Sequence, residues 1–271
     1  MHNIKKSVGF IFILLAVFTL TACGNSSKAL DDKTITVGVT GGPHEQIMQE
    51  VAKVAKKDGV TVKLKVFSDY NTPNTALDQG ELDANSFQTL PFLKNQVKSK
   101  DFKITEAFST VAFPLGIYSD KLKDLKDLKK GDKIAVPNDP ANELRALQLF
   151  EKAGIIKLDK NAGENTTKKD VVENKLDLQI VELDAAQIPA QLGEVAVAAI
   201  NTNFAMGAGL NIKDNAIYHE PLVKNPYPNY FVVRTENKDD AIGAKLKKYY
   251  QSDDVKEFIA KQFKGSVVPT W

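Results

Sequence analysis

Cysteine and histidine are scarce in this sequence. Its 271 residues include one cysteine, Cys23, and three histidines, His2, His44 and His219. A single cysteine forms no intrachain disulfide, and the zinc-protease pattern H-E-x-x-H, which would begin at His44, has Met48 in place of its second histidine. The chain also lacks G-x-S-x-G and any cluster of His, Cys and Asp, so nucleophilic and zinc chemistry lack their residues. We therefore predict that the protein is not an enzyme and uses no cofactor or metal.

The sequence has no excess of one charge and only one long apolar run. Its formal net charge is +2, with acidic and basic residues interspersed, so nothing indicates a nucleic-acid partner. The run from Val8 to Leu20 follows Lys5 and Lys6, as in a secretory signal, and is too short to span a bilayer comfortably. Because no later run is longer, we expect a soluble mature chain that is only anchored to the membrane.

The apolar run ends in LTACG (residues 20–24), which resembles the lipobox of bacterial lipoproteins. In such proteins the signal is removed before the cysteine, which is then lipidated. The alternative is a buried or free thiol, but a structural cysteine rarely stands at a cleavage point. We expect a signal peptide over residues 1–22, a lipidated Cys23 opening a polar tether over residues 23–32, and a location on the extracytoplasmic face of the cell membrane.

Strand and helix patterns alternate along the rest of the chain. A β-rich segment over Thr34–Val39, a helical pattern over His44–Lys57 and an alternating segment over Val60–Phe67 predict a βαβ unit with parallel strands. A second alternation begins at Lys133. Further predicted helices cover residues 74–79 with Thr72 as N-cap, 92–100, 140–153, 168–174, 185–191 and two segments of the tail.

Two proline-containing segments divide these alternations into lobes. Pro114 and Gly116 interrupt a β-prone stretch, and residues 225–233 carry two prolines beside a strand. We interpret these segments as crossings between lobe I, residues 33–115 and 225–271, and lobe II, residues 116–224. Strand ends and helix N-termini would then face a shared cleft, where N–H groups bind anions.

Arginine is rarer still than histidine, with only Arg145 and Arg234 in the chain. Arg145 belongs to KIAVPNDPANELRALQLF (residues 133–150), a pattern typical of a buried strand followed by a helix with Asp139 as N-cap. Asn142 and Arg145 are three residues apart and share a helix face. A guanidinium near the positive end of a helix favours a carboxylate ligand, whereas the alternative is a surface pair with an acidic residue of the same helix.

Aromatic and amide residues stand at other predicted strand ends. Tyr70, Phe87 and Phe113 lie at or near such ends, where they either complete the core or line a ligand cage. Asn201 follows a buried strand and either caps a helix or binds a ligand. Asn229 is either a turn residue or a second polar contact.

Five segments of the chain carry a family resemblance. They are DY-x-x-PN-x-AL (residues 69–77), G-x-x-DAN-x-FQ (80–88), PND-P-x-N-x-x-R (137–145), AINTNFA (199–205) and YQSDDV (250–255). Together they resemble the methionine-binding lipoprotein family, the substrate-binding components of methionine ABC importers. The resemblance covers essentially the whole mature chain in the same order.

The resemblance implies an α/β, two-lobed, periplasmic-binding-protein-like (type II) fold with two interlobe crossings. It implies a monomer that captures L-methionine or a close relative and delivers it to an ABC permease driven by its ATPase. In this family the arginine matching Arg145 pairs with the ligand carboxylate, assisted by the asparagine matching Asn142. Asparagines matching Asn201 and Asn229 hold the polar backbone of the ligand, and aromatic residues matching Tyr70 and Phe87 line the side-chain pocket. The implied ligand-binding residues are Tyr70, Phe87, Thr89, Asn142, Arg145, Asn201 and Asn229.

One segment departs from the family pattern. Many relatives read FQHKPYL where this chain has FQTLPFL (residues 87–93), so that a histidine becomes Thr89 and a tyrosine becomes Phe92. Because these changes alter the size and polarity of the pocket, a methionine-containing dipeptide, a methionine derivative or another apolar amino acid stays open as the ligand. A surface adhesin-type lipoprotein with the same fold is a further alternative, whereas a surface hydrolase lacks its residues.

Overall fold

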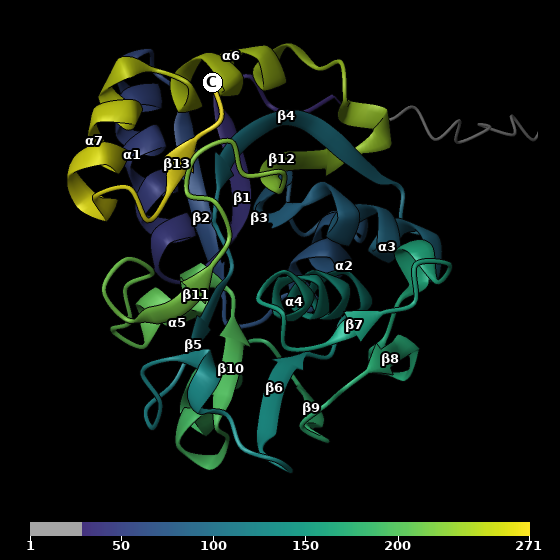
Figure 1. Cartoon of the computed structure of the whole chain (residues 1–271). Helices are drawn as coiled ribbons and strands as arrows, with labels where there is room; N and C mark the ends of the chain where they lie inside the picture. The colour runs from purple at the N-terminus through teal and green to yellow at the C-terminus, as the bar shows by residue number, and fades with distance from the viewer. Residues whose placement is uncertain (1–28) are drawn as a thin grey trace, which may run out of the picture.

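The computed structural model describes residues 29–271, which form two large β-sheets, each flanked by helices, and one small two-stranded sheet (Figure 1). Cys23 and the predicted signal peptide lie outside the described residues. The helices are α1 Pro43–Lys57, α2 Thr72–Asp78, α3 Leu90–Lys100, α4 Pro140–Lys152, α5 Thr202–Gly207, α6 Ala241–Tyr250 and α7 Asp253–Phe263. The two-lobed α/β fold predicted from the sequence is confirmed.

Sheet A occupies the upper half of Figure 1 and has six strands in the order β13-β4-β12-β3-β1-β2. Their bounds are β1 Thr34–Thr40, β2 Thr61–Phe67, β3 Ala84–Thr89, β4 Ile104–Ala112, β12 Pro228–Arg234 and β13 Val268–Pro269. The predicted parallel pairing of β1 with β2 is confirmed, and β12 joins the sheet antiparallel to both β3 and β4.

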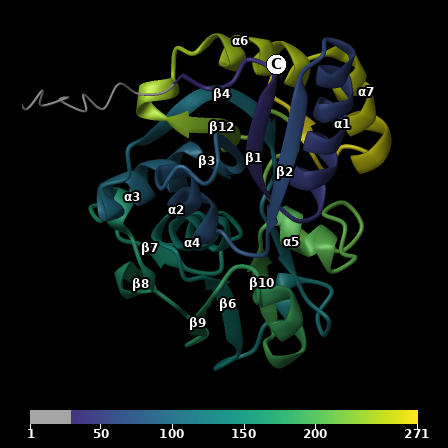
Figure 2. The ribbon, with the colours of Figure 1, turned by 180° about the vertical axis from the view of Figure 1, so that it is seen from behind.

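Helices cover both faces of sheet A (Figure 2). Side chains alternate between the faces along a strand, so Phe231 and Val233 pack against α1, α6 and α7 while Val232 packs against α2 and α3. The core on the first face includes Ile47 and Val51 of α1, four residues apart and fully buried.

Sheet B occupies the lower half of Figure 1, in the order β11-β5-β10-β6-β9. Its strands are β5 Gly116–Tyr118, β6 Lys133–Pro137, β9 Gln179–Leu183, β10 Val197–Ile200 and β11 Ala216–His219, and a separate pair joins β7 Lys157–Leu158 to β8 Val171–Glu173. The apolar side of α4 packs on one face of this sheet, and α5 with the 3₁₀ turn Ile188–Glu194 packs on the other.

The chain passes between the sheets twice. Residues 113–115 connect β4 to β5, and residues 220–227 connect β11 to β12. The two segments lie side by side, because the backbone N–H of Glu220 donates to the carbonyl of Leu115 at 2.9 Å. The site described below is built around this point.

Three local predictions were wrong. Residues 168–174 form a 3₁₀ turn and strand β8 instead of a helix, because a capping box between Thr167 and Asp170 closes the turn and the next residues pair with β7. The segment 185–191 forms a turn and then the start of a 3₁₀ segment, not an α-helix. Thr72 is the first residue of α2 rather than its N-cap, since the carboxylate of Asp69 accepts its N–H.

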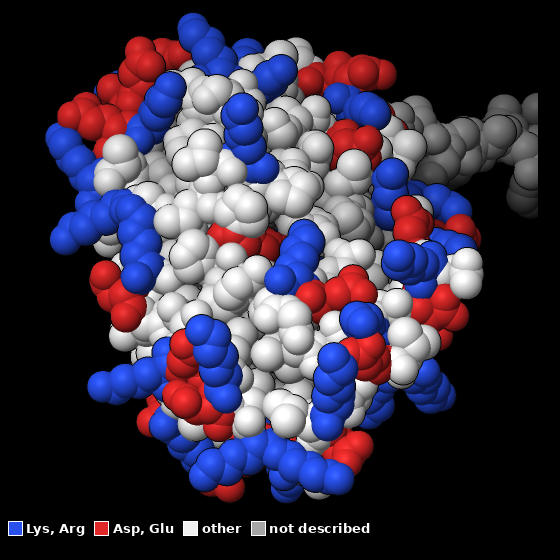
Figure 3. Space-filling model, in the orientation of Figure 1, with Lys and Arg blue, Asp and Glu red and all other residues white. Residues whose placement is uncertain are grey.

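Charged residues of both signs are interspersed over the face shown in Figure 3, with uncharged surface between them. Within residues 29–271 no helix is long and apolar enough to cross a membrane, and no group of three or more acidic, histidine or cysteine side chains is arranged to hold a metal.

Candidate functional site

Helix α4 brings Arg145 to the seam between the two sheets. As predicted, β6 ends just before the loop, and the carboxylate of Asp139 caps the helix by accepting the N–H of Asn142 at 2.9 Å. Only 4% of the Arg145 side chain is exposed. The alternative of a surface pair on this helix is therefore wrong.

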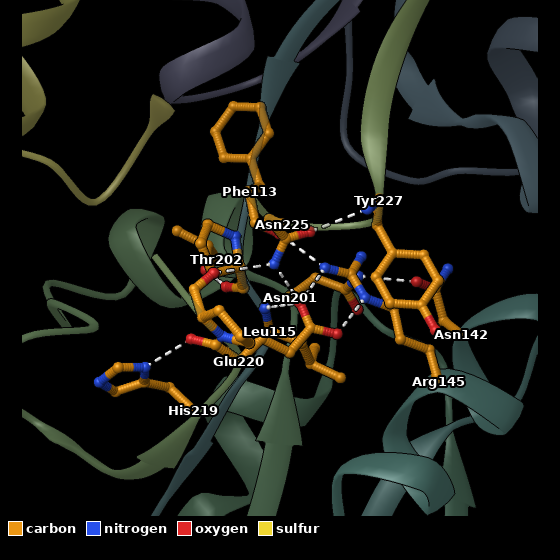
Figure 4. A network of polar contacts seen from close by, with 12 residues as sticks. Phe113, Leu115, Asn142, Arg145, Asn201, Thr202, His219, Glu220, Asn225 and Tyr227 are labelled. Atoms are coloured by element: carbon orange, nitrogen blue, oxygen red, sulfur yellow. Dashed lines mark hydrogen bonds and ion pairs between the residues drawn. The ribbon is translucent and has the colours of Figure 1, made fainter. Parts of the chain in front are cut away.

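Arg145 forms a buried, two-pronged ion pair with Glu220 (Figure 4). Its Nε donates to Oε1 at 2.8 Å and its Nη2 donates to Oε2 at 2.6 Å, while Nη2 also donates to the carbonyl of Phe113 at 2.8 Å. The ring of Tyr227 lies over the guanidinium, with its centroid 4.3 Å from Cζ. Among residues 29–271 no group accepts a hydrogen bond from Nη1, so this nitrogen is available to a ligand carboxylate.

Glu220 is held in its ionised form by its surroundings. Burial alone would raise the pKa of this carboxyl, but the hydrogen bonds and charge of Arg145 outweigh burial and lower the pKa below its usual value. Oε2 also accepts the backbone N–H of Leu115 at 2.9 Å and the side-chain N–H of Asn225 at 2.8 Å. Glu220 thus fixes the orientation of Arg145 and ties both crossing segments together.

A chain of amides runs from Asp139 toward the same cavity. The Nδ2 of Asn142 donates to both carboxylate oxygens of Asp139, at 3.1 and 3.0 Å. The Oδ1 of Asn142 accepts a hydrogen bond from Nδ2 of Asn201 at 2.9 Å. Both ends of the Asn142 amide are therefore occupied by protein, whereas Oδ1 of Asn201 is buried and has no partner among residues 29–271.

Aromatic rings form another wall of the cavity. Tyr70, Phe87 and Phe92 lie 5.8–6.0 Å apart by ring centroids, and Phe204 lies 4.7 Å from Tyr70. The hydroxyl of Tyr70 donates to Oδ1 of Asn203 at 2.5 Å, which links the loop after β2 to α5. Burial raises the pKa of Tyr70, so the hydroxyl keeps its proton and remains a donor.

Thr89 and Asn229 lie beside each other on neighbouring strands of sheet A. They are register partners at the ends of β3 and β12, and both line the cavity. The neighbouring Gln88 belongs to a buried amide cluster in which its Nε2 donates to Oδ1 of Asn74 at 2.6 Å and to Oδ1 of Asn85 at 2.8 Å. This satisfied network fixes the end of β3 that carries Phe87 and Thr89.

The remaining wall contains His44, at the start of α1. Its ring packs on Phe113 with centroids 4.4 Å apart, and it is 3% exposed. Burial lowers the pKa of His44 to about 3, so the imidazole is neutral at physiological pH.

All seven residues predicted to bind the ligand line this one cavity. Its space not filled by atoms is about 340 Å³ when the part open to solvent is included, and the centre of a water-sized sphere can move through about 20 Å³ of it. Phe113, weighed as an aromatic candidate, lines it too. Its further lining residues are His44, Gln88, Phe92, Thr202 and Asn203. Of these, Gln88, Thr202 and Asn203 stand inside the segments that carry the family resemblance, but sequence reasoning gave them no role. Glu220 had no signal in the sequence at all.

The comparison with known protein families agrees with this geometry. The sequence profile of the NlpA lipoprotein family matches residues 35–271. The chain belongs to the NlpA lipoprotein family. The predicted resemblance to methionine-binding lipoproteins is thereby confirmed, since relatives in this family carry that name.

Three similar proteins show how far the likeness extends. The D-methionine-binding lipoprotein MetQ of Salmonella typhimurium is 40% identical over 269 residues, 98% of each chain. Outer membrane lipoprotein 3 of Mannheimia haemolytica is 41% identical over 260 residues, 95% of this chain and 97% of its own. A nutrient binding protein from Burkholderia cenocepacia, solved bound to methionine, has a TM-score of 0.85 and 51% identity and covers 88% of this chain and 100% of its own.

Proposed function

We propose that this protein is the substrate-binding component of an ABC importer and that it binds methionine or a close relative in the cavity between its lobes. Arg145 binds the ligand carboxylate through Nη1, Asn201 and Asn229 bind the polar backbone, and Tyr70 and Phe87 enclose the side chain. Asn142 acts from behind Asn201, and Thr89 meets the far end of the ligand. The proposal assigns no catalytic step to the chain.

The observation that carries this proposal is that one cavity contains both an unused hydrogen-bond donor and an unused hydrogen-bond acceptor. Arg145 offers N–H donors that no residue in 29–271 uses, and Asn201 offers an unpaired acceptor. A free amino acid brings a carboxylate for the first and an ammonium for the second. The adjoining aromatic wall suits a thioether, because sulfur at a ring edge contributes on the order of 1 kcal/mol.

The relatives support both the ligand and the cellular role. One solved neighbour is bound to methionine, and another is described as the periplasmic substrate-binding protein of an ABC transporter. We propose that the present chain likewise serves a permease and its ATPase as a monomer, anchored by a lipid on Cys23 at the extracytoplasmic face of the membrane. The cavity spans the seam between the lobes, so lobe closure would bury the ligand and create the surface that a permease reads.

Calorimetry on protein that has been unfolded and refolded to remove bound ligand tests the proposal. L-Methionine, D-methionine and methionine-containing dipeptides are titrated in turn, and at least one should bind and raise the melting temperature. No binding by any of these ligands, nor by other apolar amino acids, would refute the proposed function.

Arg145→Ala tests the site itself. A charged hydrogen bond contributes roughly 1.5–3 kcal/mol, so we expect affinity to fall at least about tenfold. Arg234→Ala is the matched control, because the second arginine, at the end of β12, donates to the carbonyl of Leu82 in the loop before β3 and does not line the cavity. Equal affinities of the Arg145 variant and the wild type would remove Arg145 from the site.

A further inference from the structure

We infer that Asp139 determines which ligand group Asn201 accepts, by fixing the direction of two amides in series. This inference rests on the proposed function and adds a positioning residue that does not itself line the cavity. Asp139 affects recognition of the ammonium group of the ligand, whereas Arg145 binds its carboxylate.

The argument begins at the carboxylate. Burial raises the pKa of Asp139, and the hydrogen bonds from the backbone and side chain of Asn142 act against that rise by favouring the charged form. Both oxygens of Asp139 accept hydrogen bonds here, and an amide has one donating and one accepting end. The Asn142 amide must therefore turn its nitrogen toward Asp139, where Nδ2 lies 3.1 and 3.0 Å from the two oxygens. Its oxygen is consequently turned away from Asp139.

The same logic fixes the second amide. The oxygen of Asn142 requires a donor, and Nδ2 of Asn201 supplies it at 2.9 Å. The oxygen of Asn201 is then the end left over, buried and without a partner among residues 29–271. Figure 4 shows Asn142 and Asn201 beside the Arg145–Glu220 pair.

The consequence is a site with a fixed polarity. A ligand group beside Asn201 must donate hydrogen bonds, as an ammonium does, and a group that only accepts leaves the buried oxygen unsatisfied. If the Asp139 charge were removed, both amides could reverse, and Asn201 could present N–H instead. Asp139 therefore acts through Asn142 as a specificity-determining residue for α-amino acids over their deaminated analogues.

The test compares L-methionine with 4-(methylthio)butanoate, which keeps the carboxylate and thioether but lacks the ammonium. In Asp139→Asn the side chain still caps α4 but can donate as well as accept. Using calorimetry, we expect its affinity for L-methionine to fall about tenfold or more and its affinity for the butanoate to change less than about threefold.

Asn142→Leu separates orientation from charge, because it breaks the chain of amides but keeps the Asp139 carboxylate. We expect it to lose the preference for L-methionine as Asp139→Asn does, and it provides the same comparison if that variant does not fold. The matched control is Asp124→Asn, in which another N-cap aspartate, accepting the N–H of Lys126 at 2.9 Å, is changed outside the cavity. Its preference should equal that of the wild type.

The possible outcomes separate the inference from the proposed function. Three results would each overturn the inference. The first is an equal loss of affinity for both ligands in Asp139→Asn, and the second is no loss of affinity for either. The third is that Asp139→Asn loses the preference for L-methionine while Asn142→Leu keeps it. Failure of the wild-type protein to bind either ligand would instead count against the proposed function.

Discussion

Acidification should destabilise this protein through His44. The ring is buried against Phe113 and its pKa is lowered to about 3, whereas histidine in an unfolded chain has its ordinary pKa of about 6.5. Between these two values the unfolded state binds a proton that the folded state excludes. The folded state therefore loses stability as the pH falls from about 6.5 toward 3, and this contribution is constant above that window.

The magnitude follows from linkage. One proton of difference changes the free energy of unfolding by about 1.4 kcal/mol per pH unit, so His44 alone should cost on the order of 3 kcal/mol at about pH 4.5 relative to neutral pH. That loss is a large fraction of the roughly 5–15 kcal/mol by which a domain is usually stable.

Urea denaturation from pH 7.5 down to about pH 4.5 measures the effect, comparing the wild type with His44→Gln. The glutamine keeps a polar side chain but cannot titrate, so the variant should lose less stability on acidification, by roughly 3 kcal/mol at the acid end. Val51→Ala is the matched control on the same helix, because it removes buried apolar volume without changing a titratable group and should shift the curve equally at every pH. Parallel pH curves for the wild type and the His44 variant would refute the reasoning.

Three further substitutions probe the walls of the cavity. Glu220→Gln leaves the buried Arg145 without its counter-charge. We therefore expect urea denaturation to show a free energy of unfolding lower by about 3 kcal/mol or more, together with a loss of ligand affinity. An unchanged urea midpoint would contradict this. Tyr70→Phe removes the donor to Asn203, and calorimetry should show affinity weakened by about 0.5–1.5 kcal/mol, whereas no loss would exclude a role for this link in the bound state. Gln88→Leu strips partners from a buried amide cluster, so thermal unfolding should show a loss of at least about 1–3 kcal/mol, and a neutral effect would show that the cluster repacks.

The local parts of the site could be predicted because local chemistry determines them. The aspartate and proline at the start of α4 set its first turn, and Arg145 follows at a fixed position on that helix. Asn201 likewise stands directly after a buried strand. Their ligand-binding roles, and the lobe boundaries, stay predictions.

The partners of these residues could not be predicted, because they depend on contacts between distant segments. Glu220 lies 75 residues from Arg145, in a connection with no periodic pattern. His44 was considered only for a metal motif, and its place in the cavity depends on Phe113 from another strand end. The helix expected over residues 168–174 failed for a related reason, since pairing with β7 outweighed the local propensity of its charged residues.

The attachment of Arg145 to both crossing segments has a mechanical consequence. The guanidinium on α4 donates to Phe113 in one connecting segment and to Glu220 in the other, so any turning of one sheet against the other would have to bend two segments that Arg145 holds together. The hydrogen bond from Tyr70 to Asn203, by contrast, joins the loop after β2 to α5 without involving either connecting segment. We therefore expect an opening motion to break the Tyr70–Asn203 link more readily than the contacts of Arg145, so that the aromatic end of the cavity is where a ligand enters.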